Sequence, residues 1–234
     1  MKKQAWGWVL GAALAGMMPW AAAQEVPQAP ASATSKPLPK INYVVKGQDF
    51  QVLSPAQRST PGRTEMLVFF WYGSPWAAQV EPYLREWVER GQAPATLRLQ
   101  FVPLLANQED TWAFSARIFF ALEQMGLERE ISPKLLRAVN EKVVDLSSPK
   151  SVNTWLVQQG VNGNEFQKVI NSSMVVSQVA ALPWIARNYQ VKSTPTFVLD
   201  GKYHIASTEK MPPERALAVA MFMATKLSEG GPRP

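Results

Sequence analysis

Strand-like and helix-like hydrophobic patterns alternate in the first part of the chain. Residues 66–72 form a continuous apolar run, which is typical of a strand buried on both faces. Pro75 follows at a position suited to the first turn of a helix, and apolar residues recur at helical spacing until Gly91. Residues 96–102 alternate apolar and polar side chains, so the pattern predicts a strand-helix-strand crossover with parallel pairing. Two shorter strands are predicted at 42–45 and 50–53.

Helical spacing of apolar residues dominates the middle of the chain. A helix is predicted from Asp110 to the neighbourhood of Gly126. Serine-proline pairs at 132–133 and 148–149 each predict the start of another helix, and the first of these carries apolar residues as far as Val143. Two more helices are predicted at 164–170 and 174–189.

The strand pattern returns near the C-terminus. Residues 196–199 and 203–206 are strand candidates joined by Asp200 and Gly201, a pair typical of a tight hairpin turn. A last amphipathic helix follows the prolines at 212–213. The chain is therefore predicted to be an α/β sheet domain that an all-helical insert interrupts. The predicted boundaries are 41–106 for the first part of the sheet domain, 107–183 for the insert and 184–228 for the second part.

The two ends of the chain have a different character. Residues 1–23 combine Lys2 and Lys3, an apolar stretch and small residues up to Ala23, which predicts a signal peptide cleaved after Ala23 and an exported protein. Residues 24–40 are rich in proline and alanine and predict a flexible tether, and residues 229–234 a disordered tail. No later window is long and apolar enough to predict a membrane span.

Composition excludes several kinds of chemistry. Lys and Arg exceed Asp and Glu by 24 to 18, but the charges form no runs, which argues against a nucleic-acid partner. The chain contains no cysteine, so it forms no disulfide, thiolate nucleophile or dithiol redox centre of its own. A single histidine, His204, excludes a multi-histidine metal site. We expect neither a metal nor a cofactor.

Two segments resemble a known family. Residues 69–81 read Phe-Phe-Trp-Tyr-Gly-Ser-Pro-Trp-Ala-Ala-Gln-Val-Glu and resemble the strand-to-helix segment of the DsbA family of periplasmic thiol:disulfide oxidoreductases. Residues 191–203, with Thr-Pro before a Gly-Lys-Tyr hairpin, are similar to the cis-proline loop of that family, and 151–163 to part of its helical insert. The likeness covers about residues 41–227. It implies a thioredoxin-like fold with an inserted all-helical subdomain, located in the periplasm.

The resemblance also shows what this chain has lost. Ser74, Pro75, Trp76 and Ala77 stand where the family has Cys-Pro-His-Cys. In the family a helix N-terminus stabilises the first cysteine as a thiolate, and the second cysteine resolves the mixed disulfide. Serine is far too weak an acid to replace a thiol there. We therefore expect no catalytic residue for disulfide exchange.

The resemblance implies that polypeptide binding survives this loss. In the family, the residue before the cis-proline offers backbone groups to an extended peptide. Thr194 and Pro195 hold those positions here, and Trp71, Tyr72 and Trp76 are candidates for an aromatic floor beside them.

Structural roles compete with these functional interpretations. Trp71 and Tyr72 lie at a strand end, where core packing is the commoner outcome for aromatic residues. Ser74 before a proline is typical of a helix N-cap. We interpret Glu81 as part of a solvated helix face, because it has no cysteine to tune, and His204 as an ordinary surface or edge residue.

Two classes of function remain. The first is a redox-inactive module of the cell envelope that binds an extended or partly folded polypeptide, as a chaperone or assembly factor; a structural role in an envelope protein complex is not separable from it. The alternative is a glutathione-binding enzyme that resembles kappa-class transferases, in which the Ser74 hydroxyl donates to the glutathione thiolate. In either case, the label thiol:disulfide interchange protein would apply by homology only.

Overall fold

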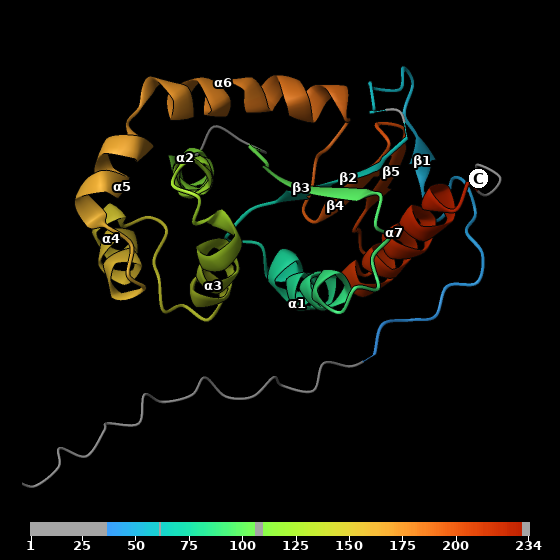
Figure 1. Cartoon of the computed structure of the whole chain (residues 1–234), viewed down its shortest axis with the longest axis horizontal. Helices are drawn as coiled ribbons and strands as arrows, with labels where there is room; N and C mark the ends of the chain where they lie inside the picture. The colour runs from blue at the N-terminus through green and yellow to red at the C-terminus, as the bar shows by residue number, and fades with distance from the viewer. Residues whose placement is uncertain (1–36, 61, 106–109, 231–234) are drawn as a thin grey trace, which may run out of the picture. The chain divides into compact units, whose positions relative to one another are not determined.

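The computed structural model describes residues 37–60, 62–105 and 110–230 and has a single mixed β-sheet at its centre (Figure 1). The strand order is β1-β5-β4-β2-β3. The strands are β1 (Gln51–Val52), β2 (Thr64–Phe70), β3 (Leu97–Pro103), β4 (Thr196–Leu199) and β5 (Tyr203–Ala206).

Strand β2 occupies an interior position of the sheet. It pairs in parallel with β3 and antiparallel with β4, and most of its side chains are buried. The helix α1 (Pro75–Glu89) connects β2 to β3, so the predicted parallel crossover is confirmed. The continuous apolar pattern of 66–72 reflects this position, since side chains on both faces of β2 meet other elements.

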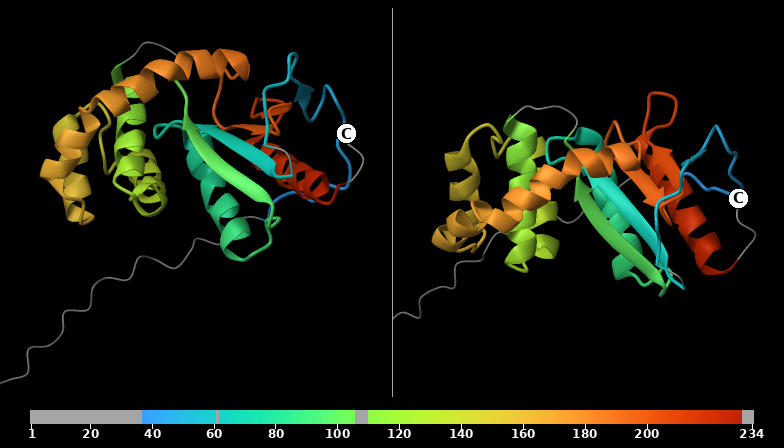
Figure 2. Two further views of the ribbon diagram at one scale, coloured as in Figure 1. Left: turned by 45° about the horizontal axis from the view of Figure 1, so that its top comes forward. Right: turned by 90° about the horizontal axis from the view of Figure 1, so that it is seen from above.

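Helices cover both faces of the sheet (Figures 1 and 2). On one face, α1 and α7 (Pro213–Ser228) pack through Leu84, Trp87 and Leu217 against Met66 and Val68 of β2. On the other face, the C-terminal half of α6 (Ser173–Asn188) packs with Phe69 and Val198. Helix α6 runs unbroken across the predicted insert boundary at residues 183 and 184, so a single helix belongs to both parts of the fold.

The remaining helices form an all-helical subdomain with its own core. Leu122, Leu135, Leu156 and Phe166 are buried together in that core. The helices that contribute them are α2 (Asp110–Gln124), α3 (Glu128–Asn140), α4 (Pro149–Gln158) and α5 (Gly163–Ile170). The thioredoxin-like sheet with an inserted helical subdomain is therefore confirmed.

The hairpin between β4 and β5 has the predicted bounds and turn. Asp200 and Gly201 both have positive φ, +48° and +61°, as a two-residue turn of this kind requires. The backbone N–H of Glu65 donates to the Asp200 carboxylate at 2.8 Å, which ties the turn to β2.

Two sequence predictions are wrong at the level of elements. Residues 42–45 form no strand, because the Val45 N–H donates to the Asp49 carboxylate at 2.9 Å in a local turn; of 50–53, only Gln51 and Val52 belong to a strand. Helix α3 begins at Glu128 rather than at the Ser132-Pro133 pair, and Val143 lies beyond its end, exposed.

The Ser132-Pro133 signal has a structural explanation. The Ser132 hydroxyl bonds to the hydroxyl of Tyr72 at 2.6 Å instead of capping a helix. Gly126, with φ +70°, reverses the chain after α2, so the next helix begins almost at once. Pro133 is accommodated inside that helix.

The predicted signal peptide, most of the predicted tether and residues 231–234 of the predicted tail lie outside the described residues. Within the described ranges, no single helix is long and apolar enough to cross a membrane; α5 and α6 together reach that length and composition, across a 53° bend.

Candidate functional site

Ser74 lies at the start of α1, directly after the central strand. Its backbone N–H donates to the carbonyl of Trp71 at 2.9 Å, and its hydroxyl accepts from the N–H of Ala77 at 3.2 Å. Pro75 is the first helical residue. The predicted N-cap is thus confirmed, because the Ser74 side chain satisfies one of the N–H groups that a helix start leaves without a partner.

The second resembling segment lies against this turn. The peptide bond between Thr194 and Pro195 is cis, and the Ser74 hydroxyl donates to the Thr194 carbonyl at 3.4 Å. The fold therefore brings together two segments that are 120 positions apart in the sequence. Ser74 exposes 5% of its surface. Its hydroxyl acts both as a hydrogen-bond acceptor, from Ala77, and as a donor, to Thr194.

Two predicted contact residues remain accessible at this point. Trp76, in the first turn of α1, exposes 37% of its surface. Thr194 is half-buried, whereas Pro195 is buried. Within the described ranges, no atom accepts a hydrogen bond from the Thr194 backbone N–H. The site thus presents an exposed aromatic side chain and a free backbone donor.

Tyr72 and Trp71 do not form an exposed floor beside Trp76. Tyr72 is completely buried; its burial raises the pKa of the hydroxyl, which bonds to Ser132. Trp71 is half-buried and stacks on Trp112 of α2, with ring centroids 4.2 Å apart. The structural interpretation therefore holds for Tyr72, whose side chain has no surface for a peptide to contact.

Glu81 corrects a prediction, because it does not lie on a solvated face of α1. Its side chain is 12% exposed and pairs with Arg85 at 2.5 Å. Burial raises the pKa of the Glu81 carboxyl above its ordinary value, against the opposing effect of Arg85. Glu81 lies on the side of α1 that faces α3, where Pro133 and Leu136 line the same hollow.

His204 is half-buried and lies on an interior strand, so the predicted edge position is wrong. It pairs with Gln51 of β1 on one side and Val198 of β4 on the other, so it is inside the sheet. Burial lowers the pKa of its imidazole, and no described residue bonds to its buried Nε2 atom. Among the residues that the structure describes, no acidic or nucleophilic side chain bonds to His204.

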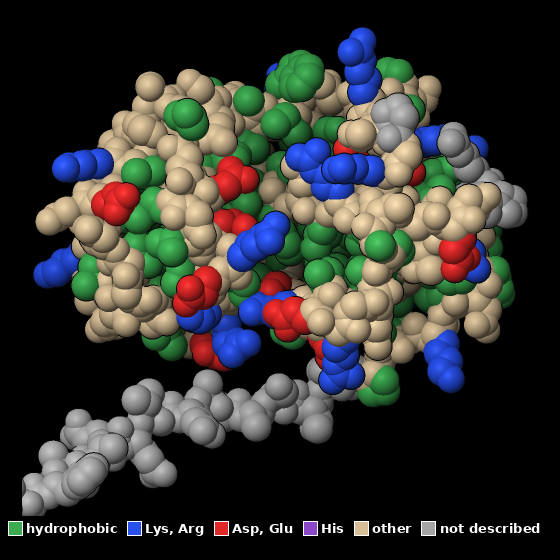
Figure 3. All heavy atoms as spheres, viewed as in Figure 1, with side chains coloured by type: hydrophobic (Ala, Val, Ile, Leu, Met, Phe, Trp, Pro, Cys, Tyr) green, Lys and Arg blue, Asp and Glu red, His purple; other side chains and the backbone are tan. Residues whose placement is uncertain are grey.

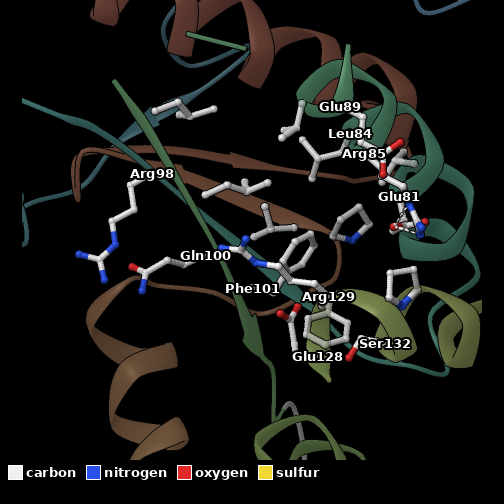
Figure 4. Close-up of a pocket in the computed structure, with 18 of the residues that line it drawn as sticks. Glu81, Leu84, Arg85, Glu89, Arg98, Gln100, Phe101, Glu128, Arg129 and Ser132 are labelled. Carbon is white, nitrogen blue, oxygen red and sulfur yellow. Dashed lines mark hydrogen bonds and ion pairs between the residues drawn. The ribbon is translucent and has the colours of Figure 1, made fainter. Parts of the chain in front are cut away.

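A large hollow in the described part of the chain is not predicted from the sequence. It has a volume of about 1050 Å³ and lies between β3, α1 and α3 (Figures 3 and 4). We call it the β3 groove and define it by Leu84 of α1, Leu99 and Phe101 of β3, and Glu128 and Ser132 of α3. Ala77 and Pro195 also line it, so the groove extends to the inner side of the Ser74 turn.

The sequence predicts one element of this groove, strand β3, but not its position at the edge of the sheet. The alternation at 96–102 predicted β3, but only the strand order shows that β3 is at the edge of the sheet. Metal binding has no support in this region, since the described residues contain no cluster of three or more His, Asp or Glu side chains that could hold an ion.

The fold and the site together define a class of protein. The chain has a thioredoxin-like sheet, an inserted helical subdomain, and a cis-proline loop facing a helix start. With no cysteine anywhere in the chain, this arrangement cannot perform thiol-disulfide chemistry.

Comparison with known proteins gives the family. The family model of the DSBA-like thioredoxin domain matches residues 65–215. The thiol:disulfide interchange protein DsbA of Pseudomonas aeruginosa is 29% identical over 185 residues, which cover 79% of this chain and 86% of that protein. The same-named protein of Bordetella pertussis is 30% identical over 156 residues, 64% of this chain and 69% of that protein.

Solved structures agree with this assignment. The crystal structure of Pseudomonas aeruginosa DsbA matches with a TM-score of 0.70 and 28% identity, covering 80% of this chain and 96% of that one. The oxidoreductase NmDsbA1 of Neisseria meningitidis shares the fold, with a TM-score of 0.65 and 20% identity over 82% of this chain and 98% of its own. This chain belongs to the DsbA-like thioredoxin family, as a member whose active site is degenerate.

Proposed function

We propose that this protein is a polypeptide-binding module of the periplasm, a chaperone or assembly factor that captures extended segments and performs no disulfide exchange. The observation that carries the proposal is the exposed Trp76 on the turn that contacts the Thr194-Pro195 loop, whose Thr194 N–H is free of any described partner. The signal-like sequence at residues 1–23 and the family support an exported location.

The contact chemistry follows from these groups. An extended segment that lies along the loop accepts a hydrogen bond from the Thr194 N–H, as in strand addition. Trp76 then contacts an apolar side chain of that segment, and a tryptophan at the centre of a contact is typically worth about 2 kcal/mol or more. Binding of this kind needs no thiol, which is consistent with a site that lacks one.

The geometry counts against the glutathione alternative. A hydroxyl that activates a bound thiolate must direct its proton at the sulfur. Ser74 is buried as a residue, and its hydroxyl already donates toward the Thr194 carbonyl. A glutathione sulfur would have to displace that contact to reach the hydroxyl of a buried residue.

The test compares two tryptophans and one serine with the same probe. Binding of reduced, carboxymethylated α-lactalbumin, an unfolded polypeptide, is measured by fluorescence anisotropy. We expect Trp76→Ala to weaken binding about tenfold or more and Ser74→Ala to change it little. Trp184→Ala is the matched control, because Trp184 is exposed on α6.

Each of the other outcomes has a clear meaning. Equal loss in Trp76→Ala and Trp184→Ala would show nonspecific attraction to exposed tryptophan and would contradict the proposal. A larger loss in Ser74→Ala than in Trp76→Ala would do the same. Glutathione binding is measured by titration to about 10 mM, because the Michaelis constants of enzymes for their substrates are typically ~1 μM–1 mM. Saturable binding that disappears in Ser74→Ala would favour the glutathione alternative.

A further inference from the structure

The β3 groove contains one open edge of the sheet. Strand β3 pairs with β2 on one side, and no other strand in the described part of the chain pairs with it. Hydrogen bonds at both ends of this parallel pair show which residues of β3 direct their backbone groups toward β2, which we call the phase of the pairing. The Thr64 N–H donates to the Thr96 carbonyl at 3.3 Å, and the Leu104 N–H donates to the Phe70 carbonyl at 2.8 Å. In a parallel pair, every second residue of each strand bonds to its neighbour.

The phase decides which backbone groups of β3 are free. Arg98, Gln100 and Val102 carry the groups that bond to β2 in this register. The N–H and C=O groups of Leu99 and Phe101 therefore point away from β2, and no described residue bonds to them. An unpaired strand edge is a template for another strand unless the protein shields it.

Two walls enclose this edge instead of covering it. Leu84 and Val88 of α1 line one side of the groove, and Ser132 and Leu136 of α3 line the other. Figure 3 shows green side chains inside the hollow and charged ones around it. The described part of β3 spans seven residues, a length of about 20 Å at ~3.3 Å per residue.

The charged side chains that line the groove are unevenly placed. Glu128 and Arg129 lie at the end near Phe101, whereas Arg98 lies further along β3 and Glu89 at the far end of α1 (Figure 4). Glu123 and Arg63 also line the groove. None of these charged side chains forms a salt bridge in the described part of the chain. Burial raises the pKa of the Glu128 carboxyl; the nearby Glu123 adds to this effect and Arg129 opposes it. Two carboxylates and one guanidinium thus line that end of the groove, which leaves room for one more positive charge.

We propose that the β3 groove binds an extended polypeptide by strand addition to β3, with a lysine or arginine of that segment beside Glu123 and Glu128. Alternate side chains of the segment then point toward α1 and its apolar wall, because strand side chains alternate between faces. The inference concerns a different surface from Trp76 and does not depend on the proposed function.

The shape of the groove favours a peptide over a second copy of this chain. The open edge is recessed between α1 and α3, and a single extended chain, ~5 Å from its neighbour in a sheet, enters such a space. Two recessed edges approach one another only if the walls of both copies move apart.

The direct test is amide hydrogen exchange by NMR on the full-length mature protein. The probes are nonapeptides that alternate threonine with valine, leucine or phenylalanine and carry lysine at one end and glutamate at the other. We expect a bound peptide to slow exchange of the Leu99 and Phe101 amides. The amides of Gln100 and Val102 serve as internal controls, because they already bond to β2.

Variants separate backbone pairing from side-chain packing. Leu99→Pro removes the outward N–H and leaves the ladder to β2 intact, a position where a strand tolerates proline; Leu99→Ala keeps that N–H. We expect about a tenfold loss of affinity, or ~1.4 kcal/mol, in Leu99→Pro and a smaller loss in Leu99→Ala. Glu128→Gln should weaken binding and reduce its dependence on salt. If Leu99→Pro does not fold, the proposal is tested by hydrogen exchange in the wild type, where bound peptide must slow exchange of the Leu99 and Phe101 amides.

The outcomes distinguish this inference from the proposed function. Protection of Leu99 and Phe101 that persists in Trp76→Ala supports the groove. Protection confined to Thr194, or no protection by any peptide of the set, overturns the inference, and the first of these results supports the proposed function. Protection that appears without peptide as protein concentration rises identifies a second copy as the occupant and also overturns it.

Discussion

Glu81 shows how tertiary structure changes the meaning of a single side chain. The sequence places it on the first helix after the degenerate motif, where a solvated position was the simplest interpretation. The insert instead buries the carboxyl, which raises its pKa, and Arg85 only partly offsets this effect. Burial therefore makes the ionised form of this carboxyl less favourable in the folded protein.

This position leads to a prediction about pH. The folded-state pKa of Glu81 lies above its unfolded value, so ionisation costs stability at pH values above the folded pKa. We expect Glu81→Gln to unfold at a higher urea concentration than the wild type at pH 7. The difference should shrink as pH falls through the folded pKa, because the wild-type carboxyl then becomes neutral in the folded protein.

The control for this prediction is Glu86→Gln on the same helix. Glu86 pairs with Arg90 where both side chains are largely exposed, and such pairs contribute about 0–1 kcal/mol. We expect no stabilisation from this variant. A Glu81→Gln variant that is less stable than the wild type at pH 7 would show that the pair with Arg85 outweighs the cost of burial.

For Ser74, unlike Glu81, the local sequence correctly predicts the role of the side chain. Serine before proline and an apolar helix predicts an N-cap, and the hydroxyl accepts from Ala77 as that role requires. Its second contact, with the Thr194 carbonyl, comes from a segment that no local pattern links to it.

At the scale of the element, the β4–β5 hairpin joins local turn chemistry to long-range packing. Gly201 has φ +61°, and a Cβ atom at this position would lie 2.6 Å from the backbone oxygen of Gln57. The Gln57 N–H also donates to the Gly201 carbonyl at 2.8 Å. The turn therefore needs glycine both for its conformation and for the close approach of segment 53–57.

Substitution of this glycine separates the two requirements. We expect Gly201→Ala to lower the free energy of unfolding by about 2–3 kcal/mol, from a positive φ that costs ~1–2 kcal/mol and from the clash with Gln57. Gly126→Ala is the matched control, because Gly126 has φ +70° but no atom within 4 Å of its Cβ position. Equal losses in urea denaturation would show that the clash relaxes at no cost.

At the scale of the whole molecule, the fold has kept the scaffold of its family without the chemistry. A TM-score of 0.70 to Pseudomonas aeruginosa DsbA accompanies a complete absence of cysteine. The helix start at Ser74 and the facing cis-proline loop are both present. The two missing thiols are therefore sufficient to exclude disulfide exchange on this scaffold.

Restoring the cysteines tests whether the scaffold still supports this chemistry. We expect the Ser74→Cys, Ala77→Cys double variant to catalyse reduction of insulin by dithiothreitol, which the cysteine-free chain does not, because the helix N-terminus lowers the pKa of the first thiol. Ser74→Cys alone should form mixed disulfides without turning over. A folded but inactive double variant would contradict the prediction and show that the turn has changed shape as well.

The elements and the loss of the thiol chemistry can be predicted from the amino-acid sequence. Regular hydrophobic periods located nearly all strands and helices, since each element buries one face or both and its pattern records this. The failures at 42–45 and at the start of α3 came from side chains with distant or turn-specific partners, such as the contact between Ser132 and Tyr72. The absence of cysteine excluded disulfide exchange without any structure.

Which surfaces of the protein are open follows from its folded structure and not from local sequence patterns. Strand order placed β3 at an edge and His204 inside the sheet, and packing of the insert buried Tyr72 and Glu81 while Trp76 stayed exposed. Exposure depends on what covers a side chain, and the covering residues come from segments far away in the sequence. A hydrophobic pattern records that a face is apolar, but the fold determines whether that face becomes core or groove.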